Sequence, residues 1–252
     1  NKLEAQGHRP LLQNDPNRLP DIYDPAFIHA DADLTAVAAG LAASRSGRIC
    51  LYGPPGTGKT AYGRWLAEQM GAPLLVKRAS DLMSPYVGEN ERNIARAFRE
   101  AQSEGAVLLI DEVDSFLQDR REAQRGWEVS LVNEMLTQME AFQGVFVATT
   151  NLMKHLDQAA LRRFDFKIEF GFLRLEQRWS LFQAYCSHFG IACPAALEYS
   201  VGKLHMLTPG DFAVVAKCAR ITPITSAQQL FELLQAECAL KENGSKGSFG
   251  FV

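Results

Sequence analysis

The sequence predicts an α/β fold, a parallel sheet covered by helices on both faces and followed by a small all-helical lid domain. Three observations predict it. Short runs rich in Val, Ile, Leu and Phe alternate with helical patterns as far as residue 171. A Gly- and Pro-rich loop joins the first of these runs to a helical pattern. After Gly171 the strand signals stop. Strand–helix alternation is typical of parallel sheets with helices on both faces.

Length and composition indicate a folded protein with a sizeable core: 252 residues, of which 47% are hydrophobic and 22% charged. The net charge of -3 makes nucleic acid an unlikely partner, because phosphate binding usually needs a basic surface. The five cysteines are odd in number and form no close pair, which disfavours a disulfide framework or zinc site and favours a cytoplasmic location. No apolar run approaches the length of a membrane span.

The elements follow in order along the chain. Residues 1–20 contain three prolines and no periodicity, so we expect an extended arm. Apolar residues at helical spacing then predict a helix over 32–43. Buried strands are expected at 48–52, 73–78, 107–111, 144–150 and 167–170. Between them, apolar residues that share one helical face predict helices around 62–70, 94–101 and 132–139.

The region after Gly171 reads as a second, smaller domain. Helical patterns are expected at 179–189, 211–220 and 227–241. We therefore divide the chain into an α/β domain over 21–171, a helical lid over 172–242 and a tail over 243–252. The tail has little helix or strand propensity and is expected to be mobile.

The loop GPPGTGKT has the full pattern G-x-x-x-x-G-K-[ST], with a strand before it and a helix after it. Glycines let successive backbone N–H groups turn towards phosphate oxygens at the positive end of a helix dipole. The lysine of the pattern reaches the β- and γ-phosphates, and its last hydroxyl binds Mg²⁺. ATP with Mg²⁺ is the expected ligand, bound by Gly53, Pro54, Pro55, Gly56, Thr57, Gly58, Lys59, Thr60 and Ala61.

Two carboxylates end the apolar strand VLLIDE, where they would be costly unless they served a site. Asp111 is expected to hold the Mg²⁺ shell, partly through water, and Glu112 to act as the general base towards the attacking water. A kinase would carry the same two features. At this point hydrolysis is therefore not separated from phosphoryl transfer to an acceptor.

These motifs resemble those of the AAA+ ATPases, and in particular the branch that contains proteasomal ATPases, katanin and spastin. The resemblance covers roughly residues 21–241 and names the loop as Walker A and LLIDE as Walker B. Within it, VATTN resembles the first sensor, which implies that Asn151 orients the attacking water. LDQAALRRF resembles the arginine-finger segment, which implies that Arg162 and Arg163 act at the γ-phosphate of a neighbouring subunit. The family often has Pro-Gly between these two arginines, and this chain does not.

The same resemblance suggests how the protein acts on a substrate. SPYVGENE resembles the first pore loop, which implies that Tyr86, Val87 and Gly88 grip a polypeptide in a central channel. LTPGDF stands where the family often has Ser-Gly-Ala-Asp, which implies that Gly210 and Asp211 lie close to the nucleotide. IYDPAF resembles the segment that contacts adenine, here through the backbone of Ile22 and Tyr23; a simple packing arm is the alternative.

The family implies a homo-oligomer, a hexameric ring that hydrolyses ATP and remodels a polypeptide client. Two alternatives remain open from the sequence. A nucleic-acid motor or loader on the same core would predict a basic pore and salt-sensitive binding to single strands. A weakly hydrolysing, ATP-dependent scaffold would not need both Glu112 and the arginine pair.

Overall fold

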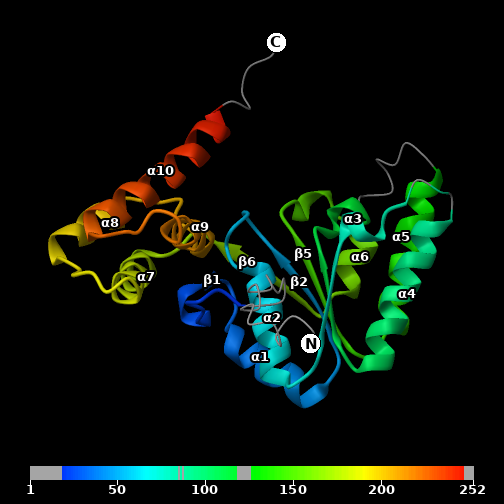
Figure 1. Cartoon of the computed structure of the whole chain (residues 1–252). Helices are drawn as coiled ribbons and strands as arrows, with labels where there is room; N and C mark the ends of the chain where they lie inside the picture. Colours follow the sequence, from blue (N-terminus) through cyan, green and yellow to red (C-terminus); the bar gives the residue numbers. More distant parts are fainter. Residues whose placement is uncertain (1–18, 85, 87, 118–125, 247–252) are drawn as a thin grey trace, which may run out of the picture.

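The computed structural model describes residues 19–84, 86, 88–117 and 126–246. Its centre is a six-stranded sheet in the order β1-β6-β2-β5-β4-β3 (Figure 1). All neighbours are parallel except β1 and β6, which pair antiparallel. The strands are β1 (His29–Ala30), β2 (Gly47–Tyr52), β3 (Leu74–Arg78), β4 (Val107–Asp111), β5 (Val145–Thr150) and β6 (Phe166–Gly171).

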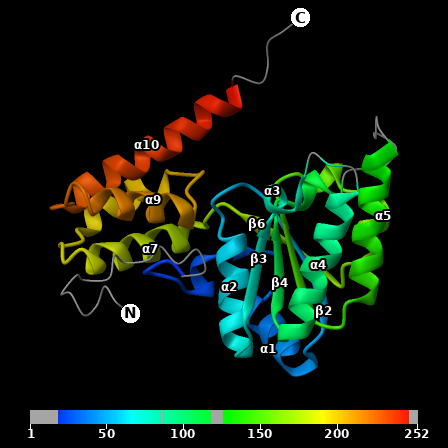
Figure 2. The same ribbon diagram turned by 45° about the vertical axis from the view of Figure 1, so that its right-hand side comes forward.

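Helices cover both faces of this sheet, because successive strand residues point to opposite sides. On β4, Leu109 packs in one hydrophobic cluster with α1 and α2, whereas Leu108 and Ile110 pack in another with α4 and α5. Figures 1 and 2 show the two helical layers on either side of the strands. The helices of this domain are α1 (Leu34–Ser44), α2 (Lys59–Met70), α3 (Ala79–Leu82), α4 (Glu89–Glu104), α5 (Gly126–Ala141) and α6 (Gln158–Arg163).

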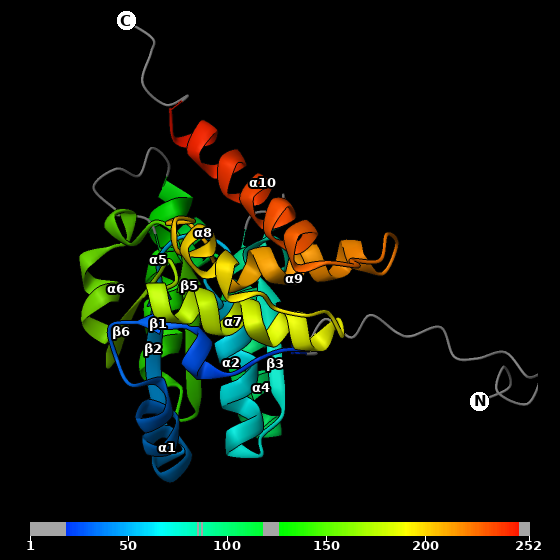
Figure 3. The same ribbon diagram turned by 90° about the vertical axis from the view of Figure 1, so that its left-hand side faces the viewer.

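The second unit contains four helices around a core of its own, with the aromatic residues Phe182, Tyr185 and Phe212 at its centre. It lies beside the α/β domain, and the C-terminal part of α10 projects beyond it (Figures 2 and 3). Its helices are α7 (Leu175–His188), α8 (Glu198–Gly202), α9 (Pro209–Ala219) and α10 (Ala227–Lys246). None of the helices in the described part of the chain has the length and apolar character needed to span a bilayer.

The α/β class and the five parallel strands are confirmed, with strand ends within one residue of those expected. The sequence missed β1, α3, α6 and α8, which are all too short to show a period. Helix α10 continues past Glu242, where we expect the lid to end, as far as Lys246. Residues 1–18 of the expected arm over 1–20 and the last six residues of the expected tail lie outside the described residues.

Candidate functional site

The phosphate loop joins β2 to α2 in a conformation that only glycine adopts easily. Gly53 has φ +133°, and a Cβ there would lie 2.0 Å from the Phe170 carbonyl oxygen. The loop is held from inside by Thr57, which is fully buried and donates to the Pro54 carbonyl at 2.8 Å. Gly58 precedes α2, and no side-chain hydrogen bond caps the helix in the described structure. Its first N–H groups and its dipole therefore suit an anion.

Lys59 is the buried cation of the site. Its ammonium group donates to the Gly53 and Pro54 carbonyl oxygens and to Asn151 Oδ1, each at 2.8 Å. Burial lowers the pKa of Lys59 to about 8, although the carboxylates of Asp111 and Asp114 act in the opposite direction. The ammonium thus bonds to the loop itself and to the expected sensor residue.

Asp111 and Thr60 offer oxygen atoms at one point between β4 and α2. Thr60 Oγ1 lies 3.1 and 3.3 Å from the two Asp111 carboxylate oxygens, and the Thr149 hydroxyl also donates to Asp111. A hydroxyl and a carboxylate are hard oxygen ligands of the kind Mg²⁺ prefers beside phosphates. Among the described residues no three His, Cys, Asp or Glu side chains gather to hold a metal by themselves. The donor set therefore fits a magnesium ion that a nucleotide brings with it.

Glu112 follows Asp111 in an unusual backbone conformation. Its φ of 62° is left-handed, and its N–H donates to Thr149 Oγ1 at 3.2 Å. The side chain is exposed and belongs to the pocket lining. Left-handed conformations of ordinary residues cost energy and collect at functional sites. The turn thus places a carboxylate in contact with solvent beside the phosphate loop.

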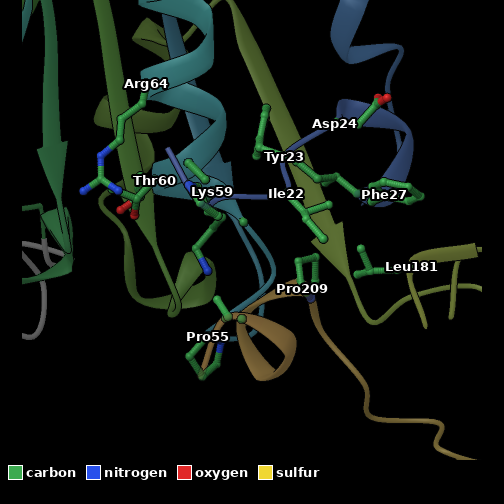
Figure 4. Close-up of a pocket in the computed structure, with 18 of the residues that line it drawn as sticks. Ile22, Tyr23, Asp24, Phe27, Pro55, Lys59, Thr60, Arg64, Leu181 and Pro209 are labelled. Atoms are coloured by element: carbon green, nitrogen blue, oxygen red, sulfur yellow. The ribbon is translucent and has the colours of Figure 1, made fainter. Parts of the chain in front are cut away.

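These groups share one cavity of about 330 Å³ between the two domains. Figure 4 shows Lys59 and Thr60 on one side of it and Ile22, Tyr23 and Phe27 on another. The lid completes the wall with Leu181, Tyr185, Pro209, Gly210 and Ala213. Burial raises the pKa of Tyr23 well above its usual value, in keeping with the apolar surroundings of its ring. A polar end suits phosphates, and an apolar end suits a planar base.

The comparison with known families agrees with this geometry. Residues 49–172 match the model of the ATPase family associated with various cellular activities (AAA). The chain contains an AAA ATPase domain. The match begins inside β2 and ends one residue after β6, so it spans the phosphate loop, Asp111, Glu112 and Asn151. The AAA match supports ATP binding and hydrolysis in general terms.

The two predicted arginine-finger residues, Arg162 and Arg163, lie outside the cavity lining. Both are in the last turn of α6. Arg163 donates to the Ala159 carbonyl at 2.9 Å and forms an ion pair with Glu140 of α5 at 2.7 Å. Arg162 is exposed. The structure thus separates the adjacent pair into one arginine that is held by contacts within the chain and one that is exposed.

Two of the predicted pore residues, Tyr86 and Gly88, lie just before α4 and are not part of the cavity lining. Tyr86 is 69% exposed, a large value for an aromatic residue. Gly88 adopts φ +80° at the start of α4, and a Cβ there would meet nothing within 4 Å. Val87 lies outside the described residues.

In the lid, Gly210 and Asp211 have different surroundings. Gly210 lines the cavity, and its N–H donates to the Gly56 carbonyl at 2.8 Å. Asp211 is buried and does not line the cavity; its carboxylate caps α9 at Thr208 and pairs with Lys241. Sequence reasoning missed the contacts of Thr149 and Thr208 and the part of the apolar wall that Leu181, Tyr185 and Ala213 of the lid supply. Of these, only the contact of Thr149 could have been expected, because Thr149 lies in VATTN two residues before Asn151.

Proposed function

We propose that the protein is a ring-forming, hexameric ATPase that couples Mg²⁺-dependent ATP hydrolysis to the movement of a polypeptide. The observation that carries the proposal is the meeting of Lys59, Asp111, Glu112 and Asn151 in one cavity. They come from α2, β4, the turn after β4 and the position directly after β5, so the fold itself brings them together. This is the set of groups that hydrolysis of a triphosphate requires.

Each group has a role that its surroundings support. Lys59 exchanges its bonds to loop carbonyls for the β- and γ-phosphate oxygens. Asn151 Oδ1 already accepts from Lys59, which leaves its N–H₂ group to orient a water. Glu112 takes a proton from that water as the water oxygen bonds to the γ-phosphorus. The bond between the γ-phosphorus and the β-phosphate oxygen breaks in the same step. Thr60 and Asp111 would hold Mg²⁺, which neutralises charge on the phosphates.

A neighbouring subunit would complete the site. The described chain brings no arginine of α6 to its own cavity, and Arg162 is exposed at the end of that helix. This arrangement supports Arg162 as a finger that enters the cavity of the next subunit. Arg163 would support it by fixing α6 against Glu140. An arginine supplied in trans is worth about 10³–10⁵ in turnover.

The proposal of a polypeptide substrate depends on Tyr86. An exposed aromatic ring beside a left-handed glycine suits a loop that grips extended chain through apolar contact. Replacing Tyr86 with Ala should leave ATP turnover intact and abolish unfolding of a loosely folded test protein. Unfolding that persists in this variant would refute the role of Tyr86.

The deciding experiment measures ATP hydrolysis per subunit against protein concentration, with Glu112→Gln as the blank. A rate that rises with concentration and vanishes in the blank supports sites completed by neighbours. A flat rate well above the blank means a self-sufficient site and refutes the arginine role. Stimulation by single-stranded DNA or RNA, and not by unfolded protein, would support a nucleic-acid motor. ATP binding and assembly with negligible hydrolysis at every concentration would support a scaffold.

A further inference from the structure

An ion pair between partly buried Lys241 and buried Asp211 connects α10 of the lid to the phosphate loop. We propose that Lys241 is a positioning residue for nucleotide binding: it holds the start of α9 against Gly56 and so makes nucleotide affinity depend on the position of α10. The inference rests on the proposed nucleotide site. It concerns a residue outside the AAA match and outside the cavity lining.

The first link is the contact between α9 and the phosphate loop. Gly210 donates from its N–H to the Gly56 carbonyl oxygen at 2.8 Å. A Cβ on Gly210 would lie 2.8 Å from Gly56 Cα and from that oxygen, so the two backbones touch. A Cβ on Gly56 would lie 2.9 Å from Thr208 Oγ1. A shift of the start of α9 therefore moves part of the cavity wall and the loop that surrounds the phosphates.

The second link is the cap of α9. Asp211 Oδ2 accepts from the Thr208 N–H and from the Thr208 hydroxyl, both at 2.8 Å. Thr208 is fully buried, and the Asp211 side chain is 7% exposed. A buried carboxylate is costly without charged or multiple partners. The cap therefore depends on the cation that faces it.

That cation is Lys241, near the C-terminal end of α10. Its ammonium nitrogen lies 2.6 Å from Asp211 Oδ2, 3.1 Å from the Met206 carbonyl oxygen and 3.3 Å from Thr208 Oγ1. These acceptors lie in and just before the first turn of α9. One side chain thus ties α10 to the residues that dock on Gly56. The link also works in reverse, because coupling between two sites is reciprocal.

The test is titration of the intact protein with ADP by calorimetry. Lys241→Met keeps the length of the side chain and removes its charge. We expect its Kd for ADP to rise about fivefold or more, the lower end of couplings between linked sites. Lys203→Met is the matched control, because it removes an exposed lid lysine whose ammonium nitrogen lies 4.2 Å from the centre of the exposed Tyr199 ring. Unchanged ADP affinity in folded Lys241→Met would overturn the proposal, whereas wild type that fails to bind ADP would overturn the nucleotide site itself.

A second variant separates positioning from simple loss of stability. In Lys241→Met with Asp211→Asn no unpaired charge remains, so the thermal midpoint should recover towards wild type while ADP binding stays weak. Recovery of affinity together with stability would overturn the proposal. In addition, ADP should slow amide exchange in the C-terminal half of α10 in wild type but not in Lys241→Met. Equal slowing of amide exchange by ADP in wild type and in Lys241→Met would also contradict the proposal.

Discussion

At the scale of single residues, Lys59 links the protonation of the site to its ligand. Burial lowers its pKa to about 8 in the free protein. Bound phosphates favour the charged form, so the pKa must be higher in the complex. At a pH between the pKa of Lys59 in the free protein and its pKa in the complex, nucleotide binding should therefore take up a proton. We predict that titration of Lys59 leaves the Kd for ADP unchanged below about pH 7. Above pH 8 the same titration should raise the Kd by up to about tenfold per pH unit.

Calorimetry in two buffers of different ionisation enthalpy checks this directly. The apparent heat of ADP binding at about pH 8.5 should differ between the buffers by the heat of one proton or less, taken up by the complex. An affinity that stays flat to about pH 9.5 would mean that Lys59 remains charged throughout, against the effect expected of its burial.

Thr150 is a second residue with a testable role, because its hydroxyl connects Asp114 to Leu152, the residue after Asn151. It donates to Asp114 Oδ1 at 2.8 Å and accepts from the Leu152 N–H at 2.9 Å. Thr150→Val removes both bonds while keeping the shape of a buried side chain. We expect ATP turnover to fall about tenfold, since misplacing a catalytic amide is costly, with ADP affinity unchanged. Thr150→Ser should restore turnover; an equal loss in the serine variant would contradict a role for the hydroxyl.

At the scale of elements, α2 packs unusually close to the sheet. A Cβ on Gly63 would lie 2.2 Å from Leu109 Cδ1 on β4 and 3.7 Å from Val147 Cγ1 on β5. The close approach brings the N-terminal end of α2, with Lys59 and Thr60, to the ends of these strands. We predict that Gly63→Ala lowers the free energy of unfolding by about 1–3 kcal/mol through overpacking, measured by denaturant titration.

Gly40 provides the matched control, because it is also a helical glycine. It is exposed on α1, and a Cβ there meets nothing within 4 Å. Gly40→Ala should therefore raise the free energy of unfolding by about 0.4–1 kcal/mol through a less flexible unfolded chain. If both variants changed stability by the same amount in the same direction, close packing of α2 would not be the cause.

Elements also differ in how far the sequence predicts them. The buried strands were predictable, because runs such as VLLID are apolar on both faces, and the Gly-rich loop marks the start of α2. The antiparallel pairing of β1 was not predictable: two residues, His29 and Ala30, cannot show a period, and only their pairing with Phe170 and Gly171 makes them a strand. The contacts of Lys241 were equally hidden, since they join residues 30 or more positions apart.

At the scale of the whole molecule, the proposed catalytic groups fall into two sets at different places. Glu112 lies in the cavity, and Arg162 lies on α6 outside the cavity lining. A complete site would then need the cavity of one subunit and the arginine of another. Neither variant that removes one of these groups should hydrolyse ATP when it assembles alone. The two variants should differ only in which half of the site they retain.

Mixing the two variants tests this division. Glu112→Gln keeps its arginine, and Arg162→Ala keeps its base, so a mixed ring contains some interfaces in which both groups are intact. Random mixing in equal amounts makes about a quarter of interfaces complete, so we expect about a quarter of the wild-type rate if sites act independently. The measurement is ATP hydrolysis at fixed total protein across a range of mixing ratios, with a maximum at equal amounts. If the mixture is no more active than the two variants measured alone and added together, Arg162 and Glu112 do not complete one another's sites across subunits. That result would refute the shared site.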